Sequence, residues 1–296
     1  MQLDLFMHSA DVGLRNAVVD ALRTRDAGAM RLAIDRLRGD FPADGHLDSF
    51  EHLFSELSAL SRPEPSPAGI ADQIGRIETR LLPSVRKLLG TDATQRWIEP
   101  AYLDLARAAA GRLFSRDLAC AHAAGLFLRA GALLEARAAV VEIPSWRRIP
   151  EPLAWMAEIA LRENNPAEFW PLLAELAWIA PTLFAELLSR QNARASAVTV
   201  VRLYQEFGHK AEMDEDADES NEAAWFPAWL LVEHPELQPF LRTAQQYDSR
   251  PARSAAVLID LLLGERQGAL PIVADKRKQL RDLAPTLFHH YMARRQ

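Results

Sequence analysis

The chain has 296 residues, of which 49% are hydrophobic and 25% are charged, and its formal net charge is −6. This composition is typical of a folded protein with enough apolar residues for a sizeable core. The acidic balance argues against general attraction to nucleic acid. The single cysteine, Cys120, excludes a disulfide framework within the chain and fits a cytoplasmic location. Residues 169–188 are the most apolar stretch, but two glutamates and two prolines interrupt it, so we expect two buried helices and no membrane span.

The first sixty residues predict three helices. In residues 11–26 the apolar side chains recur at helical spacing, and Ser9 is a plausible N-cap. Residues 27–42 repeat this pattern and predict a second helix, with Pro42 just past its end. Residues 47–60 repeat the pattern once more.

Helical periodicity continues along the rest of the chain. The β-branched runs at 198–201 and 255–260 lie inside longer helical patterns, so strands are not expected. Two stretches interrupt the helices. Residues 61–69 contain three prolines and predict a linker or long loop. Residues 209–223 are acidic and nearly free of large apolar side chains, which predicts a mobile loop.

Internal sequence similarity indicates a repeat. The sequence Ala-Pro-Thr-Leu-Phe begins at Ala180 and again at Ala284, which is 104 positions later. The segment that ends at Pro42 resembles the segment that ends at Pro181, 139 positions later. Both offsets are close to whole multiples of about 34–35 residues, the period of the tetratricopeptide repeat.

These features resemble a tetratricopeptide-like array, in which antiparallel helical hairpins stack because a single hairpin cannot bury its apolar face. The resemblance covers residues 10–60 and 115–296, whereas residues 69–114 are helical but unassigned. No single unit carries the family's full Trp, Leu-Gly, Tyr, Ala, Phe and Pro signature. The resemblance implies an all-α domain of stacked hairpins over residues 9–296, a TPR-like α-solenoid. It also implies a scaffold that presents surfaces to other proteins.

Patterns for catalysis or metal binding are weak. His46 and His52 are six residues apart and do not share a helix face, and no zinc-binding spacing is present. The acidic run at 214–219 begins like a calcium loop, but Glu219 replaces the required glycine and Trp225 the final glutamate. No glycine-rich phosphate-binding motif occurs. We therefore expect a non-enzymatic protein without metal or cofactor; an enzyme whose site is not readable from sequence is the alternative.

One basic cluster is a candidate nucleic-acid contact. Residues 275–281 carry four basic side chains, but Asp275 and Asp282 bracket them. No interleaved aromatic residues support stacking on bases. A solvated helix face is the preferred interpretation, and no direct nucleic-acid partner is expected.

Aromatic residues are dense at Trp225, Phe226 and Trp229. The two tryptophans are four residues apart and share a helix face. The preferred interpretation is a core stripe that starts a helix, and the alternative is an exposed anchor for a partner protein. Trp146, in a turn between two helical segments, is also predicted to pack.

The N-terminal stretch Gln2, Leu3, Asp4, Leu5 and Phe6 resembles the pentapeptide by which bacterial replication and repair proteins dock onto the DNA polymerase sliding clamp. The family pattern is Gln, Leu, Ser or Asp, Leu, Phe, and all five positions match. The resemblance implies that Gln2 contacts polar edges of the clamp pocket and Leu3 its apolar wall. It also implies that Leu5 and Phe6 fill the deep subsite while Asp4 stays near solvent.

Two interpretations of residues 1–8 remain open. In the first, this segment tethers a bacterial scaffold to the clamp, and two buried apolar anchors supply most of the binding energy. In the second, Leu3, Leu5 and Phe6 cover the first hairpin as a terminal cap, as repeat arrays require, and the protein has a structural or assembly role.

Overall fold

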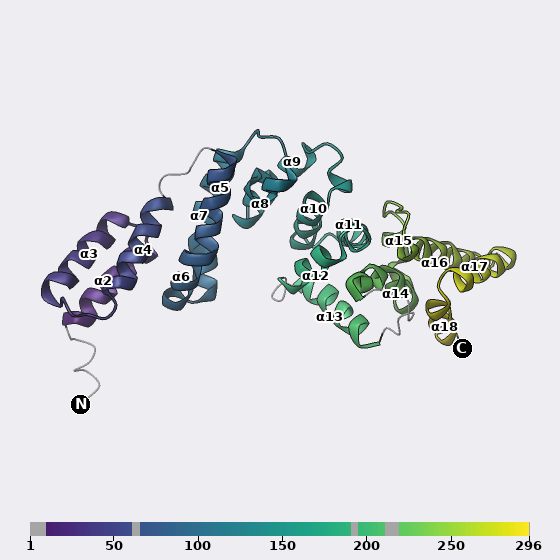
Figure 1. Cartoon of the computed structure of the whole chain (residues 1–296). Coiled ribbons are helices and arrows are strands. Elements are labelled where there is room, and N and C mark those ends of the chain that lie inside the picture. The colour runs from purple at the N-terminus through teal and green to yellow at the C-terminus, as the bar shows by residue number, and fades with distance from the viewer. Residues whose placement is uncertain (1–9, 61–65, 191–194, 211–218, 296) are drawn as a thin grey trace, which may run out of the picture. The chain divides into compact units, whose positions relative to one another are not determined.

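Figure 1 shows the computed structural model of the chain, which describes residues 10–60, 66–190, 195–210 and 219–295. Within these ranges every regular element is a helix, which confirms the predicted all-α fold. The chain divides into two compact units, Met1–Ala139 and Val140–Gln296. This division falls inside the helix Leu133–Val141. The predicted helical-repeat domain over residues 9–296, with 61–69 as a candidate break, stays a prediction.

Unit 1 begins with helices that pack on their neighbours in sequence: α2 contacts α3, α3 contacts α4, and α7 contacts α8. The buried side chains Val18 and Leu22 of α2, and Met30, Ile34 and Leu37 of α3, are three or four residues apart and face one another. The elements are α2 (Ala10–Arg23), α3 (Ala27–Asp40), α4 (Leu47–Leu60), α5 (Pro67–Arg76), the π-helix η1 (Ile77–Leu81), α6 (Leu82–Leu89), α7 (Thr91–Ala109), the 3₁₀ helix η2 (Arg116–Ala121), α8 (Ala123–Arg129) and α9 (Leu133–Val141).

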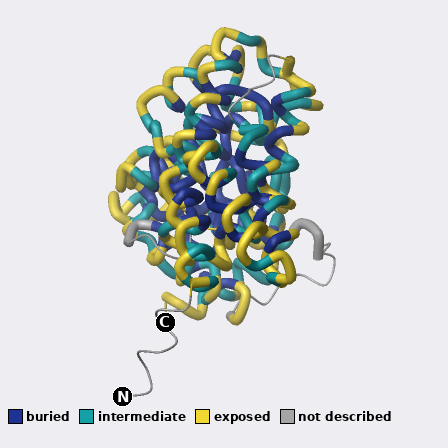
Figure 2. The backbone as a smooth tube through the Cα atoms, turned by 90° about the vertical axis from the view of Figure 1, so that its left-hand side faces the viewer, coloured by how far each residue is buried: buried dark blue, intermediate teal, exposed yellow. Residues whose placement is uncertain are grey.

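Unit 2 is built around α11, in which the consecutive residues 169–177 are all buried. The apolar stretch at 169–188 forms α11 and α12, as predicted. Helix α10 packs on α11, and α16 packs on both α14 and α17. Figure 2 shows where the buried residues run along the backbone. The elements are η3 (Trp146–Arg148), α10 (Pro150–Arg162), α11 (Pro166–Ile179), α12 (Pro181–Ser189), α13 (Ala195–Lys210), η4 (Glu219–Trp225), α14 (Phe226–Glu233), η5 (Pro235–Leu237), α15 (Gln238–Leu241), α16 (Arg250–Gln267), α17 (Leu270–Leu283) and α18 (Pro285–Ala293).

The two predicted interruptions differ in part from the structure. Residues 61–65 lie outside the described part of the chain, but Ser66 already caps α5, and its Oγ accepts a hydrogen bond from the N–H of Gly69 at 3.0 Å. The end of the predicted loop is therefore helical, because a serine followed by Pro67 is a strong helix start. Of the predicted acidic loop at 209–223, residues 211–218 lie outside the description, and its flanks belong to α13 and η4.

The same turn joins the two helices of three packed pairs: α2 with α3, α10 with α11, and α16 with α17. In each turn one residue has a positive φ, and the next residue donates its N–H to the carbonyl five positions earlier at 2.9–3.0 Å. This is the hydrogen bond that closes a helix with a left-handed residue. The left-handed residues are Arg25 at 58°, Asn164 at 54° and Gly268 at 68°.

A second recurrent junction ends the second helix of each pair. Phe41, Ala180 and Ala284 each donate their N–H to the carbonyl four positions earlier at 2.8 Å, with φ between −136° and −150° and ψ between 68° and 80°. A proline follows each of them, which disfavours helical backbone at the preceding residue. The sequence offsets of 139 and 104 therefore mark junctions with the same local structure.

Candidate functional site

The predicted docking pentapeptide, residues 2–6, lies outside the described part of the chain. Both interpretations of this segment, clamp ligand and terminal cap, therefore stay predictions. The predicted N-cap Ser9 also lies outside the described residues. The described part of the chain starts at Ala10, in α2.

The aromatic cluster at Trp225, Phe226 and Trp229 is part of the core of unit 2. Their exposed fractions are 9%, 2% and 3%. The ring of Phe226 lies 5.6 Å from that of Phe184 in α12, and the ring of Trp229 lies 5.6 Å from that of Phe207 in α13. The alternative of an exposed anchor is therefore wrong for these three residues, because η4 and α14 place them between neighbouring helices.

The charged clusters singled out in the sequence are partly paired. In the basic cluster, Lys276 lies 2.8 Å from Asp260, and Arg277 lies 3.1 Å from Glu265. The acidic run at 214–218 lies outside the description. Among the described residues, no group of three or more histidine, cysteine, aspartate and glutamate side chains is placed to hold a metal ion. None of the described helices combines the length and the apolar composition needed to cross a bilayer.

A buried ion pair organises one face of unit 2. Glu175 of α11 is fully buried. Arg147 of η3 donates from Nε to Oε2 of Glu175 at 2.7 Å and from Nη2 to Oε1, and the backbone N–H of Gln245 donates to Oε1 at 2.7 Å. A buried carboxylate is tolerated only when such donors satisfy it. The hydrogen bond to Glu175 raises the pKa of Arg147, so this guanidinium stays charged.

These contacts fix residues 242–249, here called the anchored segment, which connects α15 to α16. Arg147 Nη2 donates to the carbonyl of Thr243 at 3.4 Å, and the hydroxyl of Tyr247 donates to the carbonyl of Arg147 at 3.0 Å. The ring of Tyr247 lies 6.2 Å from that of Trp178 at the end of α11. Burial raises the pKa of Tyr247, which keeps its hydroxyl protonated as a donor. The anchored segment thus has a defined conformation although it contains no regular helix.

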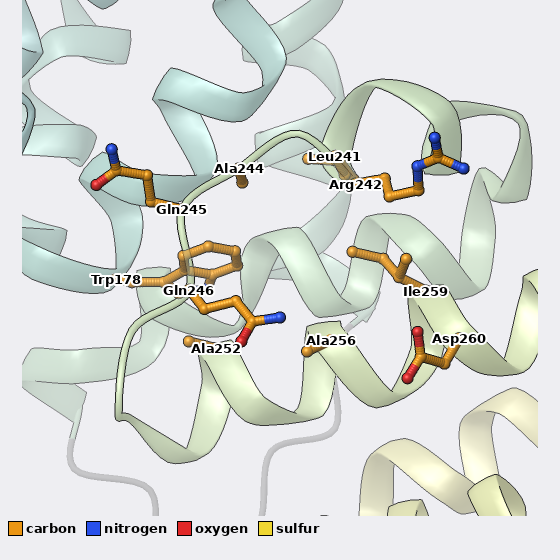
Figure 3. A pocket seen from close by; sticks show the side chains of 10 residues that line it. All are labelled: Trp178, Leu241, Arg242, Ala244, Gln245, Gln246, Ala252, Ala256, Ile259 and Asp260. Atoms are coloured by element: carbon orange, nitrogen blue, oxygen red, sulfur yellow. The ribbon is translucent and has the colours of Figure 1, made fainter.

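A small cavity, here called the Trp178 hollow, lies between the anchored segment and α16. Its volume is about 120 Å³. Figure 3 shows the indole ring of Trp178 at one end and the side chains of Arg242 and Asp260 toward the other. The hollow exists because Ala252 and Ala256 of α16 leave room beside the large ring. Nε1 of Trp178 is buried without an acceptor among the described residues.

The charge of the Trp178 hollow comes from three groups. Asp260 is neutralised by Lys276, whose Nζ is 2.8 Å away. Arg242 is exposed, and within the described part of the chain its guanidinium has no hydrogen-bond or ion-pair partner. The hollow therefore carries one uncompensated positive charge at its edge.

A second hollow, with a volume of about 350 Å³, is lined in part by Thr243 of the anchored segment. It is lined by Trp146 and Arg147 of η3 and by Pro171 and Leu172 of α11. Trp146 is half-buried, so it packs only in part.

Sequence reasoning missed these hollows for a definable reason. Arg147, Glu175 and Gln245 are 28 and 70 positions apart, so no spacing motif connects them. Trp178 lies in an apolar stretch that correctly predicted buried helices, and nothing in that pattern indicates that one ring borders a cavity. No protein-family model matches the chain, and neither a curated protein nor a solved structure is significantly similar to it.

Proposed function

We propose that the chain is a non-enzymatic, TPR-like helical-repeat scaffold of the bacterial cytoplasm that binds other proteins. The observation that carries this proposal is the recurrence of one hairpin turn at Arg25, Asn164 and Gly268. These positions are separated by the same 139 and 104 residues as the sequence similarities. Hairpins that repeat their geometry at multiples of one period are the units from which interaction solenoids are built.

In the sharper form of this proposal, residues 2–6 tether the scaffold to the DNA polymerase sliding clamp. All five residues match the clamp-binding pattern, and they lie N-terminal to α2, which begins at Ala10. Leu5 and Phe6 would enter the apolar pocket of the clamp, and Gln2 would set the register through its amide. The helical units would then bring a second partner to the site of replication or repair.

The test compares binding of the intact protein and of variants to the purified clamp of the source organism. Leu5→Ala/Phe6→Ala removes both apolar anchors, each worth roughly 1.5–3 kcal/mol, so affinity should fall about a hundredfold or more. Asp4→Ala is the matched control, because Asp4 would stay near solvent and the variant should bind within about threefold of the parent. Absence of any association with the parent protein, or equal binding by the double variant, would overturn the clamp proposal.

The same double variant separates the tether from the alternative of a terminal cap. If Leu3, Leu5 and Phe6 cover the first hairpin, the double substitution lowers the unfolding free energy of the isolated protein by several kcal/mol, as for other buried side chains. If the segment is a ligand, thermal unfolding of the protein alone stays unchanged and only clamp binding is lost.

A further inference from the structure

The size and lining of the Trp178 hollow suit a single side chain. Its volume of about 120 Å³ is somewhat below the roughly 150 Å³ of a cavity that accepts one benzene molecule. The lining is mixed: Trp178, Ala252 and Ala256 supply part of its apolar surface, and Arg242, Gln246 and Asp260 part of its polar surface. A short aliphatic stem can replace water against the apolar part at little cost.

The polar groups of the hollow favour a negatively charged end on that stem. Arg242 has an unpaired guanidinium, whereas the carboxylate of Asp260 is already paired with Lys276. Figure 3 shows the amide of Gln246 between Trp178 and Ala256, where it adds a neutral donor. The anchored segment that carries Arg242 and Gln246 is held by Glu175 and Tyr247, so both donors are presented on a fixed backbone.

We propose that the Trp178 hollow binds a glutamate or aspartate side chain of a partner protein. The methylene groups of this side chain lie against the ring of Trp178 and the two alanines. Its carboxylate accepts a hydrogen bond from the amide of Gln246 and pairs with the guanidinium of Arg242, whose exposed side chain must turn toward the hollow from the direction drawn in Figure 3. The inference rests on the proposed scaffold function, whose second partner it describes, but it does not depend on residues 2–6.

A nucleic acid is the competing ligand, because Trp178 could stack on a base and Arg242 could contact a phosphate. The structure favours the protein carboxylate for two reasons. The hollow holds one uncompensated cation, whereas binding of a nucleic-acid backbone needs a series of them. Its volume is also suited to an acidic side chain rather than to a base with its sugar.

The experiment follows the indole N–H resonance of Trp178 in the full-length ¹⁵N-labelled protein, assigned by its loss in Trp178→Phe. The probes are the N-acetyl, N′-methylamide derivatives of glutamate, glutamine and lysine, and a short oligothymidylate. The glutamate probe should give a saturable shift with a Kd of about 1–10 mM, the range expected for so small a ligand. The glutamine probe should bind about threefold to fivefold more weakly, since it lacks the charge, and the lysine probe should give no saturable shift.

Three variants complete the test. Arg242→Gln should weaken binding of the glutamate probe about threefold to fivefold. The control Arg253→Gln removes another exposed arginine, which does not line the hollow and is paired with the exposed Asp248 at 3.7 Å, and it should leave the affinity unchanged. Ala256→Leu fills the hollow and should abolish the shift, with an unchanged thermal unfolding curve as proof of folding. If Ala256→Leu does not fold, the proposal is decided by the affinities of Arg242→Gln and Arg253→Gln for the glutamate probe.

The proposal is overturned by any of four results: no saturable shift with the glutamate probe up to about 50 mM, equal binding of lysine and glutamate probes, no effect of Arg242→Gln, or a saturable shift with oligothymidylate alone. None of these results bears on the clamp, because the probes report on unit 2 and the clamp experiment on residues 2–6. Leu5→Ala/Phe6→Ala should therefore bind the glutamate probe as the parent does.

Discussion

At the scale of single residues, Asp44 illustrates how the backbone stabilises a carboxylate in the loop between α3 and α4. The N–H of His46 donates to its Oδ1 at 2.8 Å, and Nε of Arg15 donates to its Oδ2 at 2.7 Å. The hydrogen bond from His46 and, after it, the interaction with Arg15 outweigh burial and hold the pKa of Asp44 below its usual value. The loop is thus tied to α2 through an ionised side chain.

This lowered pKa predicts an acid-dependent loss of stability. The folded pKa of Asp44 lies below the unfolded value of about 3.9, so its contribution is complete above that value and is lost as the pH falls through the folded pKa. Urea unfolding at a series of pH values should show that Asp44→Asn destabilises the protein at neutral pH and that this difference shrinks below about pH 4. Asp40→Asn, at an exposed position, controls for the loss of one charge. A pH-independent difference between Asp44→Asn and the parent would contradict the expectation.

Two glycines in unit 2 predict opposite effects of the same substitution. Gly268 has a φ of 68°, where an added Cβ strains the backbone although no atom lies within 4 Å, so Gly268→Ala should destabilise the protein by about 1 kcal/mol. Gly208 lies within α13, where an added Cβ also meets no atom within 4 Å, so Gly208→Ala should stabilise it by about 0.5–1 kcal/mol. Chemical denaturation of both variants measures the two signs. If both substitutions changed the unfolding free energy in the same direction, backbone conformation would not determine the effect of the added methyl group.

At the scale of elements, the ion pair between Arg147 and Glu175 joins three parts of unit 2: η3, α11 and the anchored segment. Glu175 is fully buried, and its donors come from Arg147 and from the backbone of Gln245. Such a pair adds little stability over an apolar pair of the same shape, but it is costly to break from one side. Its main effect is to specify one conformation for a segment that lacks helical hydrogen bonds.

Removal of Arg147 should therefore lower the unfolding free energy much more than removal of the adjacent Arg148. Arg147→Ala leaves the carboxylate of Glu175 buried without its cation and should lower the unfolding free energy by about 3 kcal/mol or more. Arg148→Ala removes the next, exposed arginine and should change it by less than about 0.5 kcal/mol. Thermal or urea unfolding measures both changes. Equal losses of unfolding free energy in the two variants would argue against a stabilising ion pair between Arg147 and Glu175.

Helices were predictable from sequence because their signals are local. The pattern in residues 27–42 predicted a helix with Pro42 just past its end. The structure confirms this, because α3 spans Ala27–Asp40 and Phe41 leaves the helix directly before Pro42. The ion pair between Arg147 and Glu175 and the Trp178 hollow were not predictable. They depend on which helices pack together, and residues 28 or more positions apart leave no periodic signal.

At the scale of the whole molecule, the chain consists of two units that share one kind of hairpin. The left-handed turn occurs at Arg25 in unit 1 and at Asn164 and Gly268 in unit 2. Three different residue types adopt the same left-handed backbone conformation. Glycine does so without steric strain, whereas arginine and asparagine adopt it at a higher conformational free energy. Sequence offsets revealed these positions, whereas the division of the chain at Ala139 had no signal in composition or in turn residues.

That division has a practical consequence for dissecting the protein into fragments. It cuts α9 (Leu133–Val141), where Ala136 and Val140 are both fully buried and, four residues apart, lie on one face of the helix. Neither half of so short a helix retains its hydrogen bonds alone. A fragment pair that preserves both units must therefore overlap, with the first ending after Val141 and the second beginning before Leu133, so that each carries its own complete copy of α9.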